Sequence, residues 1–303
     1  MPPAADPLRV FDRRALRLHR SRAARGFGSA DFLVVEAAAR LADRLADVAR
    51  RFPLALDLGC RDGALARRLT GRGEVGTLIH ADAAWGFARL APPPAAVAEA
   101  EALPFKPATF DLVLSNLDLH WTNDLPGALL QLRQALKPDG LLLASLFGGE
   151  TLAELRRALM EAELAEEGGI SPRVSPFPDL RDLGRLLQRA GFALPVVDRD
   201  TIEVTYADAL ALMRDLRAMG ESNAVTERRR GFTRRATLAR AAALYRDLFA
   251  LPDGRIPARF EIVTLTAWAP HANQPLPLRP GSARARLAAA LGTIERSAGE
   301  ETR

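Results

Sequence analysis

Short apolar runs alternate with helical segments between residues 52 and 148, and this alternation limits the fold more than any other feature of the chain. Consecutive runs are separated by a turn and a segment of helical pattern, as in βαβ crossover units. The spacing therefore predicts an α/β fold with a mostly parallel sheet and helices on both faces. The runs expected to form strands are Leu54–Leu58, Thr77–Ala81, Ala95–Ala98, Phe110–Ser115 and Leu141–Phe147.

The second half of the chain is more helical. Two further strands are expected at 194–206 and 260–268, among helices at 151–167, 180–190, 207–219 and 233–250. A turn is predicted at 137–140, because a residue before proline disfavours helical angles and Asp-Gly suits a turn. The organisation we expect is a basic N-terminal arm (1–30), one domain (31–270) and a flexible tail (271–303). Within the domain, 52–148 forms a cofactor-binding core and 149–258 contains helices that cap the substrate site.

The net charge of +5 belongs to the arm. Residues 1–30 hold seven arginines and two aspartates, whereas the remaining 273 residues hold 35 basic and 35 acidic side chains. A neutral body offers no basic stripe for nucleic acid, so a nucleic-acid partner is not expected. The arm lacks the apolar core of a secretory signal. A removable presequence is less favoured than a retained element that caps the site or meets an acidic partner.

Other features exclude several classes of protein. No apolar run approaches the ~18–20 residues that span a bilayer. The single cysteine, Cys60, excludes an internal disulfide and a multi-thiolate zinc site. The four histidines form no spaced metal motif, so no metal site is expected. We expect the cytoplasm of a bacterial cell, or the mitochondrial matrix or inner-membrane face if the source is eukaryotic.

Candidate binding residues follow three of the predicted strands. The segment Asp57-Leu58-Gly59-Cys60-Arg61-Asp62-Gly63 connects the first strand to a helix, where glycines let the backbone approach a ligand. Asp82 follows the second strand, where an acid can accept hydrogen bonds from ribose hydroxyls. Glu99 follows the third strand. The glycine spacing differs from GxGxxG, so an NAD site is poorly supported.

Four motifs resemble, in order and spacing, those of class I S-adenosylmethionine-dependent methyltransferases: Asp57-Leu58-Gly59-Cys60, Glu101-Ala102-Leu103-Pro104-Phe105, Phe110-Asp111-Leu112-Val113 and Leu136-Lys137-Pro138-Asp139-Gly140. Further segments resemble the mitochondrial complex I assembly factors once classed as methyltransferases, and their bacterial relatives. These segments include Val10-Phe11-Asp12-Arg13, Phe147-Gly148-Gly149-Glu150-Thr151-Leu152 and Met219-Gly220-Glu221-Ser222-Asn223. The methyltransferase that esterifies malonyl-acyl carrier protein in biotin synthesis is similar more distantly.

The resemblance implies a three-layer Rossmann-like fold whose seven-stranded sheet has one antiparallel strand. It also implies S-adenosylmethionine as the cofactor. By motif position, Asp57, Gly59 and Gly63 would line its methionine end, and Asp82 would hold the ribose. Glu99 and Ala100 would face the adenine, and Asn116 would pass beneath the sulfonium.

Two positions depart from the family pattern. Arg61 stands where the family usually has glycine, so a positive φ there would cost ~1–2 kcal/mol. Its side chain would either intrude on the carboxylate pocket of the cofactor or bind that carboxylate. Asp118 replaces a small hydroxylated residue beside the expected methyl-donor mouth.

The acceptor side is less defined. His120 is the candidate general base, although a histidine that only hydrogen-bonds the loop is the more favoured interpretation. The other candidate substrate residues are Trp121, Tyr206, Glu221 and Asn223. For Trp121, the alternative is a role as a core residue. Methyl transfer needs mainly alignment of nucleophile and methyl group, so the lack of a triad is not evidence against it.

Methyl transfer to an unidentified acceptor, possibly a protein or carrier protein, is therefore the first hypothesis. The alternatives, from the resemblance, are hydroxylation of an arginine in a respiratory complex I subunit and a noncatalytic assembly protein that binds S-adenosylmethionine.

Overall fold

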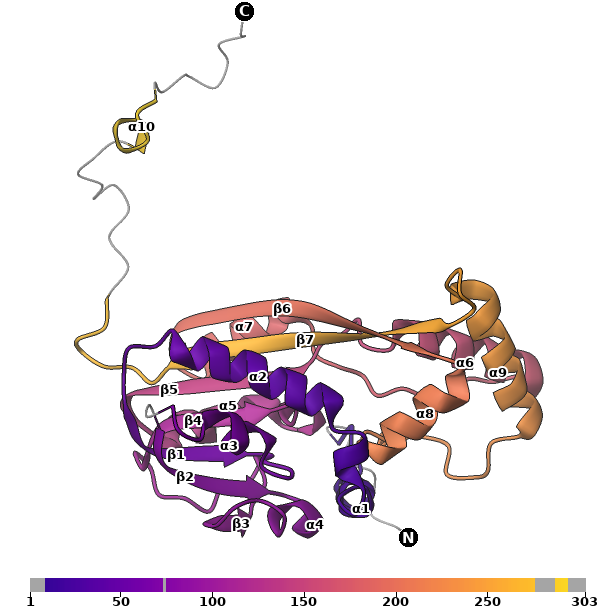
Figure 1. Ribbon diagram of the computed structural model, residues 1–303, viewed down its shortest axis with the longest axis horizontal. Helices are drawn as coiled ribbons and strands as arrows, with labels where there is room; N and C mark the ends of the chain where they lie inside the picture. The colour runs from indigo at the N-terminus through magenta and orange to yellow at the C-terminus, as the bar shows by residue number, and fades with distance from the viewer. Residues whose placement is uncertain (1–8, 73–74, 276–286, 294–303) are drawn as a thin grey trace, which may run out of the picture. The chain divides into compact units, whose positions relative to one another are not determined.

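Seven strands form one sheet in the computed structural model, which describes residues 9–72, 75–275 and 287–293 (Figure 1). Their order is β3-β2-β1-β4-β5-β7-β6, and β7 runs antiparallel to both of its neighbours. The mostly parallel sheet with one antiparallel strand is therefore confirmed. The strands are β1 (Phe52–Leu58), β2 (Val75–Asp82), β3 (Ala95–Val97), β4 (Phe110–Asn116), β5 (Leu136–Phe147), β6 (Ala193–Tyr206) and β7 (Ile256–Trp268).

The strand order reverses between β1 and β4. The chain moves outward from β1 through β2 to β3, and then returns to the other side of β1 with β4 and β5. Loops that leave β1 and β4 thus diverge to opposite faces, which opens a crevice at the carboxyl ends of these strands. Asp57 and Leu58 at the end of β1 are fully buried next to Leu114 and Ser115 of β4.

Helices cover both faces of the sheet. On one face, α2 (Phe32–Ala46) packs on α3 (Ala64–Leu69) and on the central strands. The apolar positions of α2 recur at helical spacing, and Leu33, Ala37 and Leu41 are each 1% exposed. On the other face lie α5 (Leu125–Ala135) and α7 (Leu180–Arg189). Asp124 caps α5 by accepting a hydrogen bond from the Gly127 amide (2.9 Å).

The turn expected at 137–140 is wrong. Strand β5 begins at Leu136 and passes through this segment. Asp139 adopts a positive φ (61°), which makes an irregular step in the strand instead of ending it. Its amide donates to the carbonyl of Ala269 (3.1 Å), so pairing with the chain that follows β7 continues across the irregularity.

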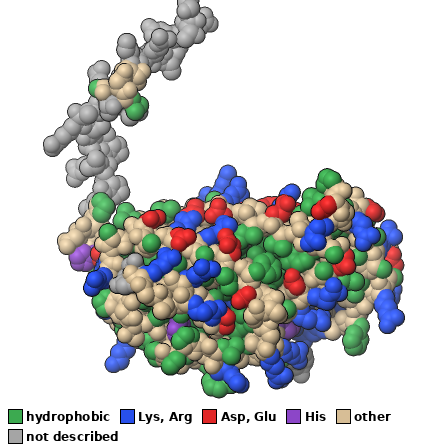
Figure 2. All heavy atoms as spheres, in the orientation of Figure 1, with side chains coloured by type: hydrophobic (Ala, Val, Ile, Leu, Met, Phe, Trp, Pro, Cys, Tyr) green, Lys and Arg blue, Asp and Glu red, His purple; other side chains and the backbone are tan. Residues whose placement is uncertain are grey.

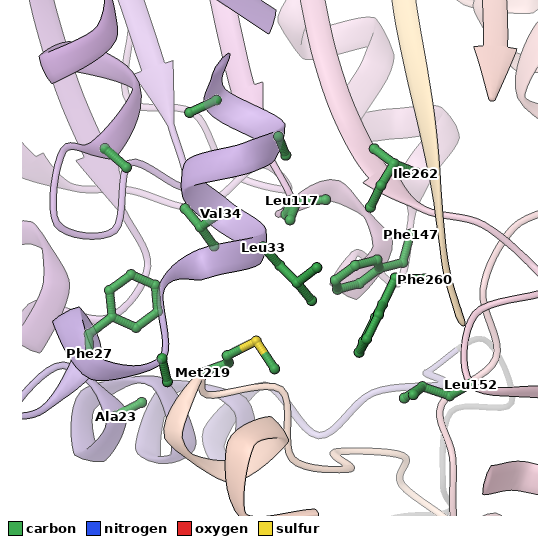
Figure 3. Close-up of a cluster of buried hydrophobic side chains, with 14 of the residues drawn as sticks. Ala23, Phe27, Leu33, Val34, Leu117, Phe147, Leu152, Met219, Phe260 and Ile262 are labelled. Carbon is green, nitrogen blue, oxygen red and sulfur yellow. The ribbon is translucent and has the colours of Figure 1, made fainter. Parts of the chain in front are cut away.

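A group of helices extends from the ends of β6 and β7. It contains α6 (Ala153–Glu167), α8 (Ala209–Ala218) and α9 (Arg235–Phe249), and α6 packs on α9 (Figure 1). Phe147, Phe260 and Met219 bring this group into the same buried cluster as Leu33 and Val34 of α2 (Figure 3). None of the helices in the described part of the chain is long and apolar enough to cross a membrane.

The N-terminal segment is docked on the domain. Phe11 forms an antiparallel bridge with Val225, and α1 (Arg13–Ala23) follows it. Figure 1 shows α1 across the end of the sheet toward which β1 and β2 point. It leads through the 3-10 turn η1 (Phe27–Ser29) to α2, while α4 (Trp85–Ala88) follows β2 beside α1. Residues 1–8 of the expected arm lie outside the described part of the chain.

Contacts divide the chain into two units, 1–270 and 271–303. In the second unit the structure describes residues 271–275 and 287–293, with the short helix α10 (Leu287–Ala290). The remaining residues of the expected tail lie outside the described ranges.

Candidate functional site

The loop after β1 turns sharply beneath the crevice. Gly59, Arg61 and Gly63 all have positive φ, at 73°, 49° and 80°. Arg61 is thus a non-glycine residue with a positive φ, and this backbone conformation costs ~1–2 kcal/mol. The same conformation directs the Arg61 side chain into the crevice, where it is 1% exposed.

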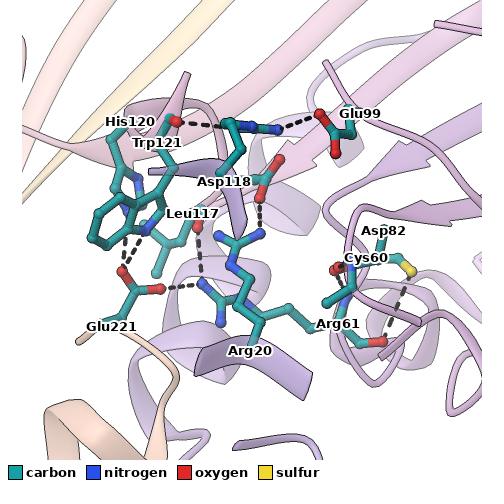
Figure 4. A network of polar contacts seen from close by, with 12 residues as sticks. Arg20, Cys60, Arg61, Asp82, Glu99, Leu117, Asp118, His120, Trp121 and Glu221 are labelled. Carbon is teal, nitrogen blue, oxygen red and sulfur yellow. Dashed lines mark hydrogen bonds and ion pairs between the residues drawn. The ribbon is translucent and has the colours of Figure 1, made fainter. Parts of the chain in front are cut away.

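The Arg61 guanidinium is held on several sides (Figure 4). It forms an ion pair with Glu221 and donates to the carbonyls of Leu117 and Met219, each at 3.0 Å. The rings of Phe27 and Phe87 lie 5.7 and 5.8 Å from its central carbon. Arg61 therefore joins the glycine loop to the segment that follows α8.

Glu221 is the acceptor at the centre of this network. Its Oε2 accepts hydrogen bonds from Trp121 Nε1 (2.7 Å) and His120 Nε2 (3.2 Å). Burial acts to raise the pKa of Glu221, but the Arg61 charge and the His120 hydrogen bond outweigh it and hold that pKa well below its usual range. The carboxylate is therefore ionised across the physiological range.

His120, on the 3-10 turn η2 (Leu119–Trp121), uses both ring nitrogens. Nδ1 accepts from the Phe147 amide (3.4 Å), which leaves the proton on Nε2 for Glu221. Burial is the main cause that lowers the pKa of His120, so its neutral form is favoured. In this arrangement neither nitrogen is free to accept a proton from a substrate.

A second ion pair closes the crevice from the arm. Arg20 of α1 is 2% exposed and pairs with Asp118 after β4. Burial acts to raise the pKa of Asp118, but Arg20 and Arg61 reverse the effect and lower it. Burial acts to lower the pKa of Arg20. Three nearby carboxylates outweigh this effect and raise that pKa: those of Asp118, Asp82 and Glu221.

The arm also covers the acid after β3. Glu99, expected beside an adenine, accepts from Arg13 (3.0 Å) and Arg17 (2.7 Å) of α1. Arg13 lies 3.5 Å from Glu101 as well. Ala100, the other expected adenine contact, is buried, at 4% exposed. Three arginines of α1 thus pair with acids that follow β3 and β4.

The remaining predicted cofactor residues lie at the base of the crevice. Asp82 accepts from the amides of Ala84 (2.7 Å) and Arg61 (3.2 Å). Burial raises the pKa of Asp82, and it also raises that of Asp57, which contacts His80 Nδ1 at 3.1 Å. The Asn116 side chain donates a hydrogen bond to the carbonyl of Val34 and accepts one from the hydroxyl of Ser145.

Next to Glu221 is an apolar pocket of about 260 Å³. Trp121, Glu221 and Asn223, three of the expected substrate residues, line it together with Phe147 and Phe177. His120 contacts it through Glu221. Tyr206 is not among the lining residues: it is 6% exposed and belongs to the hydrophobic core.

The crevice has the polar groups that an adenosyl amino acid requires, but side chains fill its cradle. Arg20 Nε and Nη2 and Arg61 Nε are buried without a hydrogen-bond partner, so they can serve a carboxylate. Asp82 can accept from a diol. A Cβ at Gly59 would overlap Asp118, and one at Gly63 would lie 2.7 Å from Pro92. The residues fit S-adenosylmethionine by chemistry, provided that Arg20 and Asp118 make room.

Sequence reasoning missed Arg20 and the carbonyls of Leu117 and Met219. Arg20 is one of seven arginines in the first 30 residues, and its place on the same face of α1 as buried Leu16 and Ala23 was the available signal. Within the described residues, no group of three or more His, Cys, Asp or Glu side chains is placed to hold a metal ion.

Comparisons with known proteins identify the family of the chain. Residues 32–195 match the family described as "Methyltransferase domain". The chain is 44% identical to the mitochondrial arginine-hydroxylase NDUFAF5 of Danio rerio, over 93% of this chain and 89% of that protein. It is 37% identical to the malonyl-[acyl-carrier protein] O-methyltransferase of Xylella fastidiosa, over 86% of this chain and 89% of that protein.

Solved structures show the same fold at low sequence identity. A candidate methyltransferase from Bacillus halodurans superposes with a TM-score of 0.53 and 16% identity, over 77% of this chain and 99% of that protein.

Proposed function

Since the chain belongs to the class I methyltransferase-domain family, we propose that it hydroxylates an arginine side chain of a protein partner. The observation that carries the proposal is the 44% identity to an arginine hydroxylase over 93% of this chain and 89% of that protein. The match is higher than the 37% identity to the O-methyltransferase. Arginine hydroxylation, an alternative drawn from the sequence, therefore replaces methyl transfer as the first hypothesis. The partner favoured by the family resemblance is a subunit of respiratory complex I.

The pocket next to the network supports an arginine as the acceptor. Glu221, which its lowered pKa keeps charged, is the acid among the residues that line it, and Arg173 and Arg217 are the basic ones. Trp121, Phe147 and Phe177 provide aromatic walls. A planar guanidinium is bound by a carboxylate and by aromatic faces. Glu221 already accepts from Arg61, Trp121 and His120, so a substrate guanidinium would share this carboxylate with them.

We propose S-adenosylmethionine as the ligand of the crevice. Asp82 would accept hydrogen bonds from its ribose, and the unpartnered N–H groups of Arg20 and Arg61 would bind its carboxylate. When bound, this group supplies an activated methyl group. The fold and the matched domain therefore support methyl transfer as a second candidate function. The third is a noncatalytic assembly protein that holds the same ligand.

The experiment expresses the full chain with the complex I subunit in cells that lack their own relative. The cell then supplies dioxygen and a two-electron reductant, which convert one C–H bond of the arginine to C–OH and release the second oxygen atom as water. The purified subunit is mapped by peptide mass spectrometry after growth under heavy-isotope dioxygen. Hydroxylation adds one labelled oxygen atom to an arginine, whereas methylation adds one CH₂ unit.

Two variants sharpen this assay. Glu221→Gln should abolish the modification, while Glu227→Gln, an exposed control, should retain it. A gain of CH₂ would replace the proposal by methyl transfer. An unmodified subunit, together with calorimetric binding of S-adenosylmethionine, would favour the noncatalytic role.

A further inference from the structure

A larger cavity, of about 930 Å³, opens on the other side of the pocket wall. It lies between the end of α1, the segment at 172–173, α8 and the loop at 222–229. We call it the arginine vestibule, because six arginines line it. They are Arg22, Arg173, Arg214, Arg217, Arg228 and Arg229.

Half of these arginines have no acidic partner among the residues that the structure describes. Arg173, Arg228 and Arg229 form ion pairs with Glu163, Asp12 and Glu167. For Arg22, Arg214 and Arg217, by contrast, the described residues provide no ion pair. All three are exposed, and Figure 2 shows basic side chains gathered over α1 and α8. Unneutralised guanidinium groups around one concavity attract anions and suit carboxylates.

The vestibule and the apolar pocket adjoin, because they share part of their lining. Arg173, Arg217, Ser222 and Asn223 line both cavities. An extended peptide advances ~3.3 Å per residue, so neighbouring residues of one segment can reach both spaces. Such a segment would place an anionic side chain in the vestibule and the next side chain beside Glu221.

The lining favours a peptide over nucleic acid. No Phe, Tyr or Trp is among the residues that line the vestibule, so bases would find no aromatic platform there.

We propose that the arginine vestibule docks an acidic segment of the protein partner and thereby guides the adjacent side chain into the apolar pocket. The identity of that side chain rests on the proposed function, but docking of the acidic segment does not. The two ideas can therefore fail separately.

The test uses fluorescence anisotropy with the full chain and a short labelled peptide that has paired glutamates on both sides of a central leucine. Its counterpart carries glutamines at the same positions. Because neither peptide contains arginine and no turnover is read, a failure of hydroxylation leaves this result unaffected. The glutamate peptide should bind at least about tenfold more tightly, with an affinity that falls as salt rises.

Paired charge reversals locate the site. Arg214→Glu with Arg217→Glu on α8 should weaken binding by at least about tenfold. Arg181→Glu with Arg189→Glu changes the net charge equally on α7, which also has ten residues, and should leave affinity within about twofold. Should the α8 variant fail to fold, Arg214→Gln with Arg217→Gln makes the same comparison.

Three outcomes would overturn the proposal. In the first, the glutamine peptide binds as tightly as the glutamate peptide. In the second, the α7 and α8 variants lose affinity equally. In the third, a single-stranded oligonucleotide binds the vestibule more tightly than the glutamate peptide, which would assign the site to nucleic acid.

Discussion

Two groups of arginines, one in the crevice and one in the vestibule, differ in what neutralises them. In the crevice, Arg20 and Arg61 are buried and paired with Asp118 and Glu221. In the vestibule, Arg214 and Arg217 are exposed and have no ion pair within the described residues. The first group holds the structure closed over the ends of the strands. The second group leaves its charge available to a ligand.

The comparison shows that neutralisation, and not composition, decides what an arginine does. Removing water from a buried charge is expensive, so such a charge requires its partner. An exposed charge is solvated and requires none. Substitutions in the two groups should therefore differ greatly in their effect on stability.

The largest effect is expected for Arg20→Met. It leaves the half-buried Asp118 and the fully buried Asp82 without the guanidinium charge, which should lower the free energy of unfolding by about 3–5 kcal/mol. Urea unfolding followed by circular dichroism measures this. Adding Asp118→Asn should recover most of the loss. If the single variant is as stable as the parent chain, the ion pair does not hold α1 in place.

The next effect concerns the turn after β1. Gly59→Ala combines a positive φ, which costs about 1–2 kcal/mol, with overlap between the new Cβ and Asp118. Gly71→Ala is the matched control, since its φ is 81° but nothing lies within 4 Å of the added Cβ. Unfolding should show a larger loss at position 59. Equal losses would mean that Asp118 moves away freely.

A smaller effect depends on pH. The pKa of His120 is lower in the folded state, so its contribution to stability is complete above its unfolded pKa of about 6.5 and is lost as pH falls toward the folded value. Between these two pKa values, the free energy of unfolding of the parent chain should fall by up to about 1.4 kcal/mol per pH unit relative to that of His120→Gln. His271→Gln, at an exposed site, should follow the parent. Parallel stability curves for all three chains would contradict this interpretation.

The smallest effect is expected in the vestibule. Arg214→Gln with Arg217→Gln should change the free energy of unfolding by no more than about 0.5 kcal/mol, because these side chains have no partner to lose. The same urea titration tests it. A loss comparable with that of Arg20→Met would show that the vestibule arginines hold the structure together. The two groups of arginines would then not differ in their effect on stability.

Much of the fold could be predicted, because the alternation of apolar runs and helices places each strand and brings their carboxyl ends together. Asp57, Asp82 and Asn116 lie there for that reason. The turn at 137–140 was wrong because Asp139 tolerates a positive φ inside β5. Tyr206 was expected among the substrate residues, but its side chain packs into the core.

The ion pairs of the site could not be predicted. Arg20 and Asp118 are 98 residues apart, and Arg61 and Glu221 are 160 apart. In a chain with 42 basic and 37 acidic residues, local sequence gives no means of choosing these partners. The strand order of the sheet places Glu99 and Asp118 beside the arm. The position of the segment after α8 places Glu221 beside Arg61.

The docking of α1 has a consequence for the order of events during synthesis. Its partners Glu99, Asp118 and Val225 are all translated after it, and Phe11 pairs with the last of them. Chains fold from the N-terminus as they emerge, so the sheet around β1 to β5 can form while α1 still lacks its complete binding surface. On the ribosome, the crevice can therefore be assembled open and be closed afterwards by α1, a helix made before the strands that it covers.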